Sequence, residues 1–412
     1  MQTHLSPEFA DTPEGEEARA ILRKCVHCGF CNATCPTYQL LGDELDGPRG
    51  RIYLIKQVLE GAEVTRRTQH HLDRCLTCLN CQTTCPSGVE YGHLVDIGRK
   101  IVDARVERPA SEKAVRWLLR AGLTSPLFAP AMRVGQVLRP LLPPALKAKV
   151  PPHTAKGTRP KITGARSRKV VMLAGCVQPS MMPNINRAAE RVLGTLGIET
   201  LYAAGAGCCG AVRSHLGDPE GGLADMRRNI DTWAPLLTSG GVEAIVTTAS
   251  ACGLAIKDYG HALAEDADYA AQAVLISELA CDVSELLPAL VPALRGKLKL
   301  GGAGPLAFHP PCTLQHGQRL GGAVEGHLRE LGFQVSSAAV EKEMCCGSAG
   351  TYSLLQPALA TQLRDRKLSH LVKLEPECIV SANIGCIQHL QSGTDTPVRH
   401  WIEVLDEALA PD

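Results

Sequence analysis

Cys25-Val-His-Cys28-Gly-Phe-Cys31-Asn-Ala-Thr-Cys35-Pro36 is the stretch that decides the fold of the first part of this chain, and it has a second version further on. The second version reads Cys75-Leu-Thr-Cys78-Leu-Asn-Cys81-Gln-Thr-Thr-Cys85-Pro86. Both runs have the spacing C-x2-C-x2-C-x3-C-P. Three thiolates separated by two residues can surround one corner of a compact metal centre, and the proline ends each run because it lacks a backbone N–H. The two runs together therefore predict metal binding through eight cysteines.

The spacing is that of a bacterial ferredoxin with two [4Fe-4S] clusters, in which the fourth cysteine of each run binds the cluster of the other run. A zinc ribbon also uses CxxC pairs, but it does not account for three cysteines in a row at this spacing followed by a fourth and a proline. We therefore expect two ligand sets, one formed by Cys25, Cys28, Cys31 and Cys85 and the other by Cys75, Cys78, Cys81 and Cys35.

The 412-residue chain has an ordinary globular composition, with 45% hydrophobic and 21% charged residues and a net charge of +1. This length is sufficient for two or three domains. The charge balance and the aromatic content of 4% argue against nucleic-acid binding. The eighteen cysteines and an N-terminus without signal-peptide features lead us to expect a reducing compartment, the cytoplasm. No stretch has the ~20 apolar residues that a membrane span requires, so we expect any membrane contact to be peripheral.

Apolar periodicity predicts helices on both sides of the first cysteine run and after the second. They are expected at residues 10–24, at 52–60, directly before Cys75, and at 89–106. We therefore assign residues 1–110 to an α-helical, ferredoxin-like domain with two [4Fe-4S] clusters.

From Lys169 onward, apolar strands alternate with helices, which predicts a parallel α/β sheet. Strands lead to Cys176 and Cys252, and the same order of elements returns with strands that lead to Cys312 and Cys386. The sequence thus predicts an internal duplication. The expected fold is an α-helical two-cluster ferredoxin domain followed by a duplicated parallel-sheet α/β domain, with repeats at residues 169–290 and 300–412.

Each repeat supplies one cysteine, then Cys-Cys-Gly, then one further cysteine, all after apolar strands. In parallel α/β sheets, ligands bind beyond the carboxyl ends of the strands. Three interpretations stay open: a further cluster or zinc in each repeat, a redox or quinone-reactive thiol site, or structural thiols. Cys281 and Cys378 match neither pattern. We expect Cys281 to lie in an apolar helical stretch, Cys378 to open a strand, and both to be ordinary buried thiols. The candidate ligands of the repeats are Cys176, Cys208, Cys209 and Cys252, and Cys312, Cys345, Cys346 and Cys386.

Residues 111–168 form a basic, proline-rich connecting segment, and no Asp or Glu occurs from Lys113 to Ala189. One interpretation is a solvated linker between two domains. The other is a basic, partly amphipathic surface that rests on anionic lipid or on an acidic partner.

The chain resembles the iron–sulfur subunits of respiratory flavin dehydrogenases, and most closely the family of glycolate oxidase iron–sulfur subunits. The stretches that carry the resemblance are Cys25–Cys31, Cys35–Glu60, His71–Cys75, Cys345–Tyr352 and Val398–Ile402. A related Cys-Cys-Gly subunit, that of heterodisulfide reductase, ends each unit in CxxC and holds a noncubane cluster. This chain departs from that pattern, because Ala255 and His389 stand three residues after the last cysteine of each repeat. His389 is a candidate substitute ligand.

The resemblance implies a subunit of a complex that oxidises glycolate to glyoxylate, and also D-lactate, with the flavin on separate FAD-containing subunits. No dinucleotide-binding GxGxxG follows a strand in this chain, so we expect no catalytic residues here. The implied role is electron transfer toward the respiratory chain, with a quinone as a candidate acceptor. Glycerol-3-phosphate and lactate-utilisation complexes are alternatives, as is an assembly module with structural clusters. Side chains inside the cysteine runs are candidate hydrogen-bond donors to the clusters, namely His27, Thr34, Thr77 and Thr84.

Overall fold

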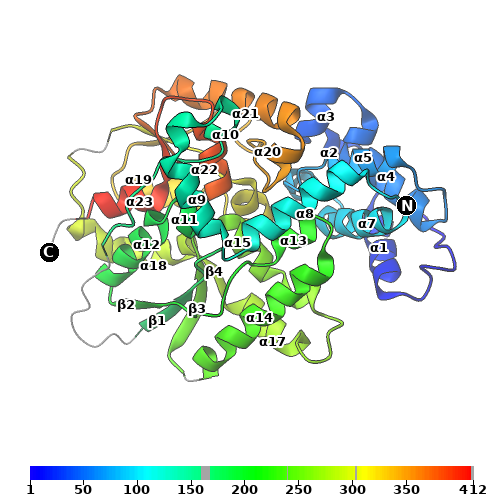
Figure 1. Ribbon diagram of the computed structural model, residues 1–412, viewed down its shortest axis with the longest axis horizontal. Coiled ribbons are helices and arrows are strands. Elements are labelled where there is room, and N and C mark those ends of the chain that lie inside the picture. Colours follow the sequence, from blue (N-terminus) through cyan, green and yellow to red (C-terminus); the bar gives the residue numbers. More distant parts are fainter. Residues whose placement is uncertain (159–167, 239, 302–303, 410–412) are drawn as a thin grey trace. The chain divides into compact units, whose positions relative to one another are not determined.

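The computed structural model describes residues 1–158, 168–238, 240–301 and 304–409 (Figure 1). The chain forms two compact units that do not follow the order of the sequence. The first unit consists of Met1–Val115 and Glu343–Lys367, and the second consists of the described residues of Arg116–Lys342 and those from Leu368 onward. The first unit therefore contains both N-terminal cysteine runs together with the Cys-Cys-Gly segment of the second repeat.

The first unit is built from helices. The longer ones are α1 (Pro13–Lys24), α4 (Pro48–Leu59), α5 (Arg66–Asp73) and α7 (Tyr91–Arg105). The shorter ones are α2 (Phe30–Ala33), α3 (Pro36–Leu41), η1 (Glu44–Asp46), α6 (Asn80–Thr84) and α20 (Tyr352–Leu355). Helix α21 (Pro357–Leu371) begins in this unit. The helices predicted around the cysteine runs are confirmed, with bounds that shift by a few residues.

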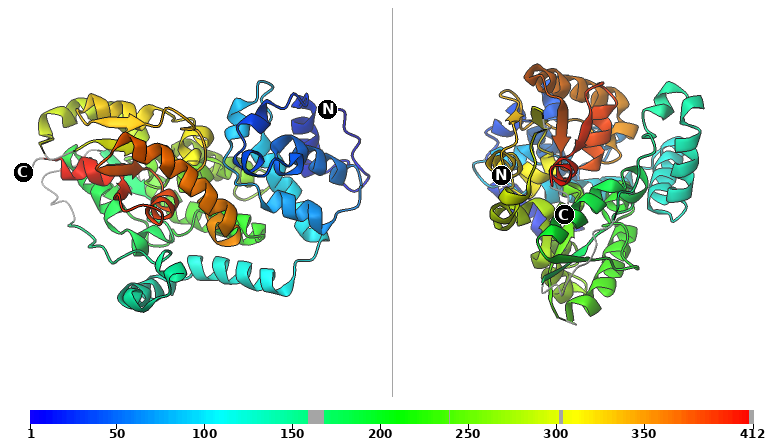
Figure 2. Two further views of the ribbon diagram at one scale, coloured as in Figure 1. Left: turned by 90° about the horizontal axis from the view of Figure 1, so that it is seen from above. Right: turned by 90° about the vertical axis from the view of Figure 1, so that its left-hand side faces the viewer.

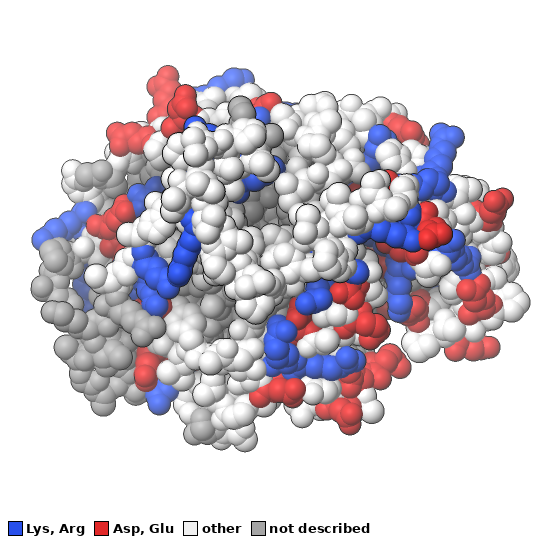
Figure 3. All heavy atoms as spheres, viewed as in Figure 1, with Lys and Arg blue, Asp and Glu red and all other residues white. Residues whose placement is uncertain are grey.

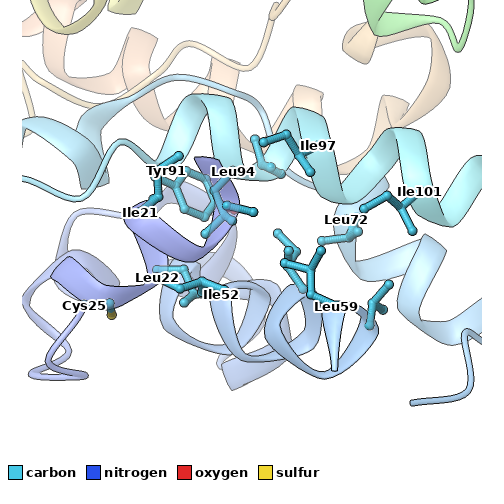
Figure 4. Close-up of a cluster of buried hydrophobic side chains, with 14 of the residues drawn as sticks. Ile21, Leu22, Cys25, Ile52, Leu59, Leu72, Tyr91, Leu94, Ile97 and Ile101 are labelled. Atoms are coloured by element: carbon cyan, nitrogen blue, oxygen red, sulfur yellow. The ribbon is translucent and has the colours of Figure 1, made fainter. Parts of the chain in front are cut away.

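The core of the first unit lies where α1, α4, α5 and α7 meet (Figure 4). Leu22, Leu59, Leu72 and Leu94 are almost completely buried in it. Burying a leucine side chain contributes about 1.5–3 kcal/mol. This core holds α1 and α5 in place, and those are the helices that lead into the two cysteine runs.

The two cysteine runs begin in the same way. Helix α1 ends where the backbone N–H of Cys25 donates to the carbonyl of Leu22 (3.1 Å), and α5 is followed by the equivalent bond from Cys75 to Leu72 (3.1 Å). A short helix follows in each run, α2 in the first and α6 in the second. The repeated spacing of the sequence thus becomes a repeated local structure.

The second unit contains two four-stranded parallel sheets with the same order of strands, β2-β1-β3-β4 and β6-β5-β7-β8. The predicted duplication is therefore confirmed. The strands of the first sheet are β1 (Arg168–Met172), β2 (Ile198–Leu201), β3 (Val242–Thr247) and β4 (Ala280–Asp282). Those of the second are β5 (Leu306–Phe308), β6 (Val335–Ser337), β7 (Cys378–Ser381) and β8 (Val398–His400).

Helices pack around both sheets of the second unit. Those of the first repeat are α12 (Asn184–Thr195), α14 (Pro219–Thr238), α15 (Ser250–Lys257), α17 (Ala270–Leu279) and α18 (Leu287–Leu294). Those of the second are α19 (Ala323–Glu330), α22 (Ile384–Gln391) and α23 (Trp401–Glu407). Trp233 and Trp401 are completely buried.

The basic segment between the cysteine runs and the first sheet contains helices, namely α8 (Ala110–Thr124), α9 (Phe128–Val137), η2 (Arg139–Leu141) and α10 (Pro144–Lys147) (Figure 2). Part of this expected linker, residues 159–167, lies outside the described residues. Across the described ranges of the chain, no helix is both long enough and apolar enough to span a membrane.

Candidate iron–sulfur and thiol sites

Cysteines of both runs line one small hollow of the first unit. Cys81 lines this hollow and also the second one described below, and we call the other four the exposed group because their member Cys28 is exposed. Burial, and after it the neighbouring thiols of this group, raise the pKa of the Cys31 thiol to about 11. The thiol of Cys28 is exposed, and Val26 and Phe30 beside it are 69% and 62% exposed. The members of the exposed group are Cys25, Cys28, Cys31 and Cys85.

The other four cysteines line a second hollow, and we call them the buried group because all four are buried. Burial raises the pKa of Cys81 well above its usual value, and three neighbouring thiols add to this. The members of the buried group are Cys35, Cys75, Cys78 and Cys81. In each group the fourth cysteine comes from the other run, which is the arrangement expected for a two-cluster ferredoxin.

The chemistry of both groups fits an iron–sulfur cluster. Four soft sulfur ligands meet in each hollow, and their proximity makes ionisation of one thiol harder when another is already ionised. A cationic centre would remove this repulsion, because a thiol that coordinates it loses its proton to water and the metal charge stabilises the thiolate. Iron is therefore suited to both groups. Without a metal, the four packed thiols of a group could not all be ionised, because their thiolates would repel one another.

A fully buried arginine lies beside the buried group. The Nε of Arg51 donates to the carbonyl of His71 (2.8 Å), and its Nη1 donates to Oγ1 of Thr37 (3.2 Å). Thr37 Oγ1 in turn lies 3.3 Å from the sulfur of Cys35. Burial alone would lower the pKa of Arg51, but negative charge at Cys75, Tyr91, Cys35 and Asp46 raises it above its usual value. The guanidinium is therefore a permanent positive charge beside this group.

The charge of Arg51 is balanced by Asp46, which is also completely buried. Asp46 Oδ1 lies 3.5 Å from Nη2 of Arg51 and 3.0 Å from Nδ1 of His71, and its Oδ2 accepts from Nη1 of Arg74 (2.7 Å). The buried carboxylate of Asp46 thus has three partners for its charge and its hydrogen bonds. Removing a partner from such a buried ion pair lowers the stability of the fold, because it leaves a buried charge uncompensated.

Two donors point at the sulfur of Cys75 in the buried group. The hydroxyl of Tyr91 donates to Cys75 Sγ at 3.6 Å, and the backbone N–H of Thr77 donates to the same sulfur at 3.4 Å. The structure thus places Thr77 at a sulfur through its backbone and not through its hydroxyl. Tyr91 and Arg51 were not predicted as donors, since neither lies within a cysteine run.

Of the predicted donors of the first run, His27 acts through its backbone, as Thr77 does, and the hydroxyl of Thr34 bonds a carbonyl. The hydroxyl of Thr34 donates to the carbonyl of Cys31 (3.3 Å). A backbone hydrogen bond from His27 lowers the pKa of Cys25, opposing the larger effect of burial. The pKa of His27 itself is lowered by burial and by the charge of Arg49. Arg49 is paired with Glu44 at 2.6 Å, at a partly exposed position.

The Cys-Cys-Gly segment of the second repeat shares the first unit with the buried group. Asn80 Nδ2 donates to the carbonyl of Glu343 (3.3 Å), and Cys345 and Cys346 are buried. Burial raises the pKa of the Tyr352 hydroxyl, and both Cys75 and Cys345 raise it further. The ring of Tyr352 therefore lies within electrostatic range of a cysteine of the buried group and of a Cys-Cys-Gly cysteine.

The four cysteines of the first repeat come together in the second unit. Hydrogen bonds from the Cys176 and Cys209 thiols lower the pKa of Cys208. The pKa of Cys209 is raised, first by its bond with Cys208 and then by its bond with Cys252. These thiols follow β1, β2 and β3, so they lie at the carboxyl ends of neighbouring strands.

Two side chains hold the loop that carries Cys208 and Cys209 through hydrogen bonds, and the conformation of this loop requires Gly210. Asn229 Nδ2 donates to the carbonyl of Cys208 (2.8 Å), and the Tyr259 hydroxyl donates to the carbonyl of Cys209 (3.1 Å). Gly210 has φ +92°, and a Cβ there would lie 2.8 Å from the carbonyl oxygen of Gly222. The four sulfur ligands fit a tetrahedral zinc or a cubane cluster.

The cysteines of the second repeat are divided between the two units. Cys312 and Cys386 are buried in the second unit, and the pair Cys345 and Cys346 belongs to the first. A ring nitrogen of His309 lies within 4.8 Å of the Cys386 sulfur. His309 was not predicted as a candidate ligand. It follows β5 directly, and the equivalent residue after β1 is Leu173, so the histidine in place of an apolar residue was a signal that could have identified it. His389 is buried in α22, three residues after Cys386, and its role as a ligand stays a prediction.

The two remaining cysteines require a correction. Cys281 lies in strand β4 and not in a helical stretch, and its thiol is only partly buried. Cys378 opens strand β7 as predicted, and it is also partly and not fully buried. Burial raises the pKa of each thiol, to about 12 for Cys281 and about 11 for Cys378. Both are therefore protonated at neutral pH.

Comparison with known families agrees with this architecture. The family model of the 4Fe-4S dicluster domain matches residues 21–89, and that of the Cysteine-rich domain matches residues 170–257 and again residues 306–391. The class is therefore that of iron–sulfur proteins with one dicluster domain and two cysteine-rich domains.

Comparison with three relatives shows which family within this class the chain belongs to. The chain is 55% identical to the glycolate oxidase iron-sulfur subunit of Escherichia coli strain K12, over 99% of each protein. It is 27% identical to the probable glycolate oxidase iron-sulfur subunit of Bacillus subtilis strain 168, over 91% of this chain and 89% of that protein. It is 23% identical to lactate utilization protein A of Oceanobacillus iheyensis, over 58% of this chain and 96% of that protein. The chain belongs to the family of glycolate oxidase iron–sulfur subunits, as the resemblance of its sequence implied.

Proposed function

We propose that this chain is the electron-transfer subunit of a glycolate dehydrogenase complex that oxidises glycolate to glyoxylate and also accepts D-lactate. The observation that supports it most is the convergence of eight cysteines into an exposed and a buried group within one helical unit. Substrate oxidation and the FAD belong to separate flavoprotein subunits, because the chain has no dinucleotide-binding motif.

Each group of four cysteines would hold one [4Fe-4S] cluster, which stores a single electron when bound. The protein's own contribution differs between the two. At the buried group the chain excludes water and supplies a positive charge from Arg51 and a hydrogen bond from Tyr91. At the exposed group it leaves Cys28 accessible, with Val26 and Phe30 beside it, so that a partner can approach closely.

The four thiols of the first repeat are proposed to hold a further metal centre, either a cluster or zinc. Their convergence after three neighbouring strands supports this. For the second repeat, the same proposal rests on the repeat in the sequence, which supplies the equivalent ligands Cys312, Cys345, Cys346 and Cys386.

The partners we propose are FAD-containing glycolate oxidase subunits, with a quinone as the final acceptor and the cytoplasm as the compartment. The name of the Escherichia coli relative supports the first of these. Thiol ligands that must stay reduced support the last. The relation to lactate utilization protein A favours a second candidate function, in which lactate is the substrate of the complex.

Metal analysis of anaerobically purified protein tests the proposal. Iron and zinc content and EPR spectra are compared between the wild type and the variants Cys209→Ser and Cys346→Ser, with Cys281→Ser as the control because its thiol lies outside all ligand sets. We expect the first two variants to lose metal and the control to keep it. If both variants keep the full content, the Cys-Cys-Gly sites do not bind metal.

Co-purification tests the assignment to a complex. The wild-type chain should co-purify with flavoprotein subunits. The complex should reduce a dye when glycolate is the substrate, and at a lower rate when D-lactate is the substrate. A complex that reduces the dye with lactate alone would support the second candidate function. Clusters that no physiological donor can reduce would contradict electron transfer and leave a structural role.

A further inference from the structure

Helix α9 of the connecting segment exposes apolar side chains on its outer face. Val134 and Val137 are 58% and 79% exposed, and Leu138 and Leu141, which follow on the same face, are 45% and 82% exposed. The opposite face carries Gln136, which is buried and donates from Nε2 to the carbonyl of Ser180 (3.3 Å). A helix on the surface of a globular protein turns its apolar face inward, so this face is built to contact something else.

The neighbouring parts of the segment share this exposure. Helix α8 has no buried residue, and its Trp117 and Leu118 are 59% and 63% exposed. Leu127, between α8 and α9, is 73% exposed. Nearly half of the exposed large hydrophobic side chains in the described part of the chain lie between Val115 and Leu146. A concentration of this kind marks an interaction surface and not the scattered exposure that is normal for surfaces.

The charge of the same segment has a single sign. No Asp or Glu occurs from Lys113 to Ala189, while Arg133, Lys147 and Lys149 are exposed. Arg139 donates to the carbonyl of Val150 (2.8 Å), so its charge is not neutralised by that contact. The area over α9 and α10 in Figure 3 is mainly white, with blue side chains beside it.

We propose that residues 116–150 form a membrane-contact surface that lies on a bilayer with anionic lipid headgroups. The apolar residues of α9 and Trp117 would enter the boundary of the acyl chains, and the arginines and lysines would pair with the headgroups. The segment lies on the bilayer and does not cross it, because none of the described helices is long and apolar enough to span one. Basic charge together with exposed apolar side chains is what an anionic lipid surface selects, and an acidic protein partner is the other occupant that the test below distinguishes.

Vesicle binding tests this proposal on the full chain, purified anaerobically with its metal. Flotation is measured with vesicles of phosphatidylcholine alone and of phosphatidylcholine with phosphatidylglycerol, at low and high salt. We expect binding to the anionic vesicles that falls as salt rises, because screening weakens the headgroup attraction. Binding to neutral vesicles should be several-fold lower.

A matched pair of variants separates the proposed surface from general hydrophobicity. Val137→Ser with Leu141→Ser removes two exposed apolar side chains from the surface, and binding should fall about tenfold or more. Val274→Ser with Leu275→Ser removes two half-exposed apolar side chains of α17, and binding should not change. Metal content and EPR spectra should be those of the wild type in both, which keeps the result independent of the proposed electron-transfer function.

Two results would overturn the proposal. One is equal binding of the wild type to neutral and anionic vesicles, or no binding to either. The other is unchanged vesicle binding by the Val137→Ser, Leu141→Ser variant together with lost co-purification of flavoprotein subunits, which would assign the surface to a protein partner.

Discussion

The exposed and the buried cysteine groups have the same spacing in the sequence but opposite surroundings in the fold. Val26 and Leu76 hold the same position in the two runs, yet Val26 is 69% exposed and Leu76 is 5% exposed. Phe30 and Asn80 are a second such pair, with exposures of 62% and 3%. Identical ligand spacing therefore does not imply an identical site.

The difference between the groups determines what each can do. A positive charge and hydrogen bonds to sulfur stabilise the reduced, more negative state of a cluster and raise its reduction potential. Arg51, which is fully buried, and Tyr91 supply both at the buried group, whereas Arg49 near the exposed group is partly exposed, so that water screens its charge. We therefore expect the higher potential at the buried group.

The largest effects should follow from removing a ligand of either group. Cys28→Ser and Cys78→Ser should each remove one of the two clusters, which is about half of the iron of a dicluster domain. Iron analysis and EPR measure this. Cys35→Ser should give the spectrum of Cys78→Ser, because Cys35 belongs to the buried group although it lies in the first run. A Cys35→Ser spectrum that matches that of Cys28→Ser would show that the grouping is wrong.

Replacing the buried arginine should have the next largest effect. Arg51→Met leaves Asp46 without one of its partners, so the free energy of unfolding should fall by about 3 kcal/mol, and the potential of the buried-group cluster should fall as well. Denaturant unfolding and redox titration monitored by EPR measure the two effects.

Two controls accompany the Arg51 substitution. Arg51→Lys keeps the charge and should keep most of the potential. Arg49→Met, at the exposed group, should change stability by at most about 1 kcal/mol, because its ion pair is partly exposed. Equal effects of Arg51→Met and Arg49→Met would contradict the role given to burial.

The equivalent positions Val26 and Leu76 allow a direct comparison of packing. Leu76→Ala should lower the free energy of unfolding by about 2–3 kcal/mol, because it leaves a cavity beside the buried group. Val26→Ala should change it by less than about 0.5 kcal/mol, as expected for an exposed side chain. Thermal or denaturant unfolding of the metal-loaded protein measures both, and similar losses at the two positions would remove the distinction between the groups.

The smallest effect should come from a single hydroxyl. Tyr91→Phe removes the hydrogen bond to Cys75, and a bond worth about 1 kcal/mol corresponds to about 40 mV for a one-electron couple. The potential of the buried-group cluster should fall by up to this amount. Tyr53→Phe is the control, since Tyr53 is 46% exposed and its ring lies edge-on to that of His27, a residue of the first cysteine run. A shift in Tyr53→Phe as large as that in Tyr91→Phe would rule out the hydrogen bond as the cause.

Some elements of the fold were not predicted. Strands β4 and β8 were missed, although β5 is equally short and was predicted. Strand β4 follows α17 without a break and β8 has a single apolar residue, so neither gives a separate apolar run. Cys281 was assigned to a helical stretch for the same reason. The exposed apolar face of α9 could not be predicted either, because a pattern of apolar residues does not say which side of a helix meets the protein.

By itself, the sequence determined the two cysteine runs, the helices that lead into them and the duplication of the parallel sheet. These are local features, since ligand spacing and apolar periodicity operate within a few residues along the chain. Only the tertiary structure decided which group of cysteines is buried, because the residues responsible come from elsewhere. Arg51 lies in α4, Tyr91 begins α7, and the Glu343–Lys367 segment joins the first unit from the far end of the chain. Burial and charge depend on neighbours in space, and these two properties make equal spacings into unequal sites.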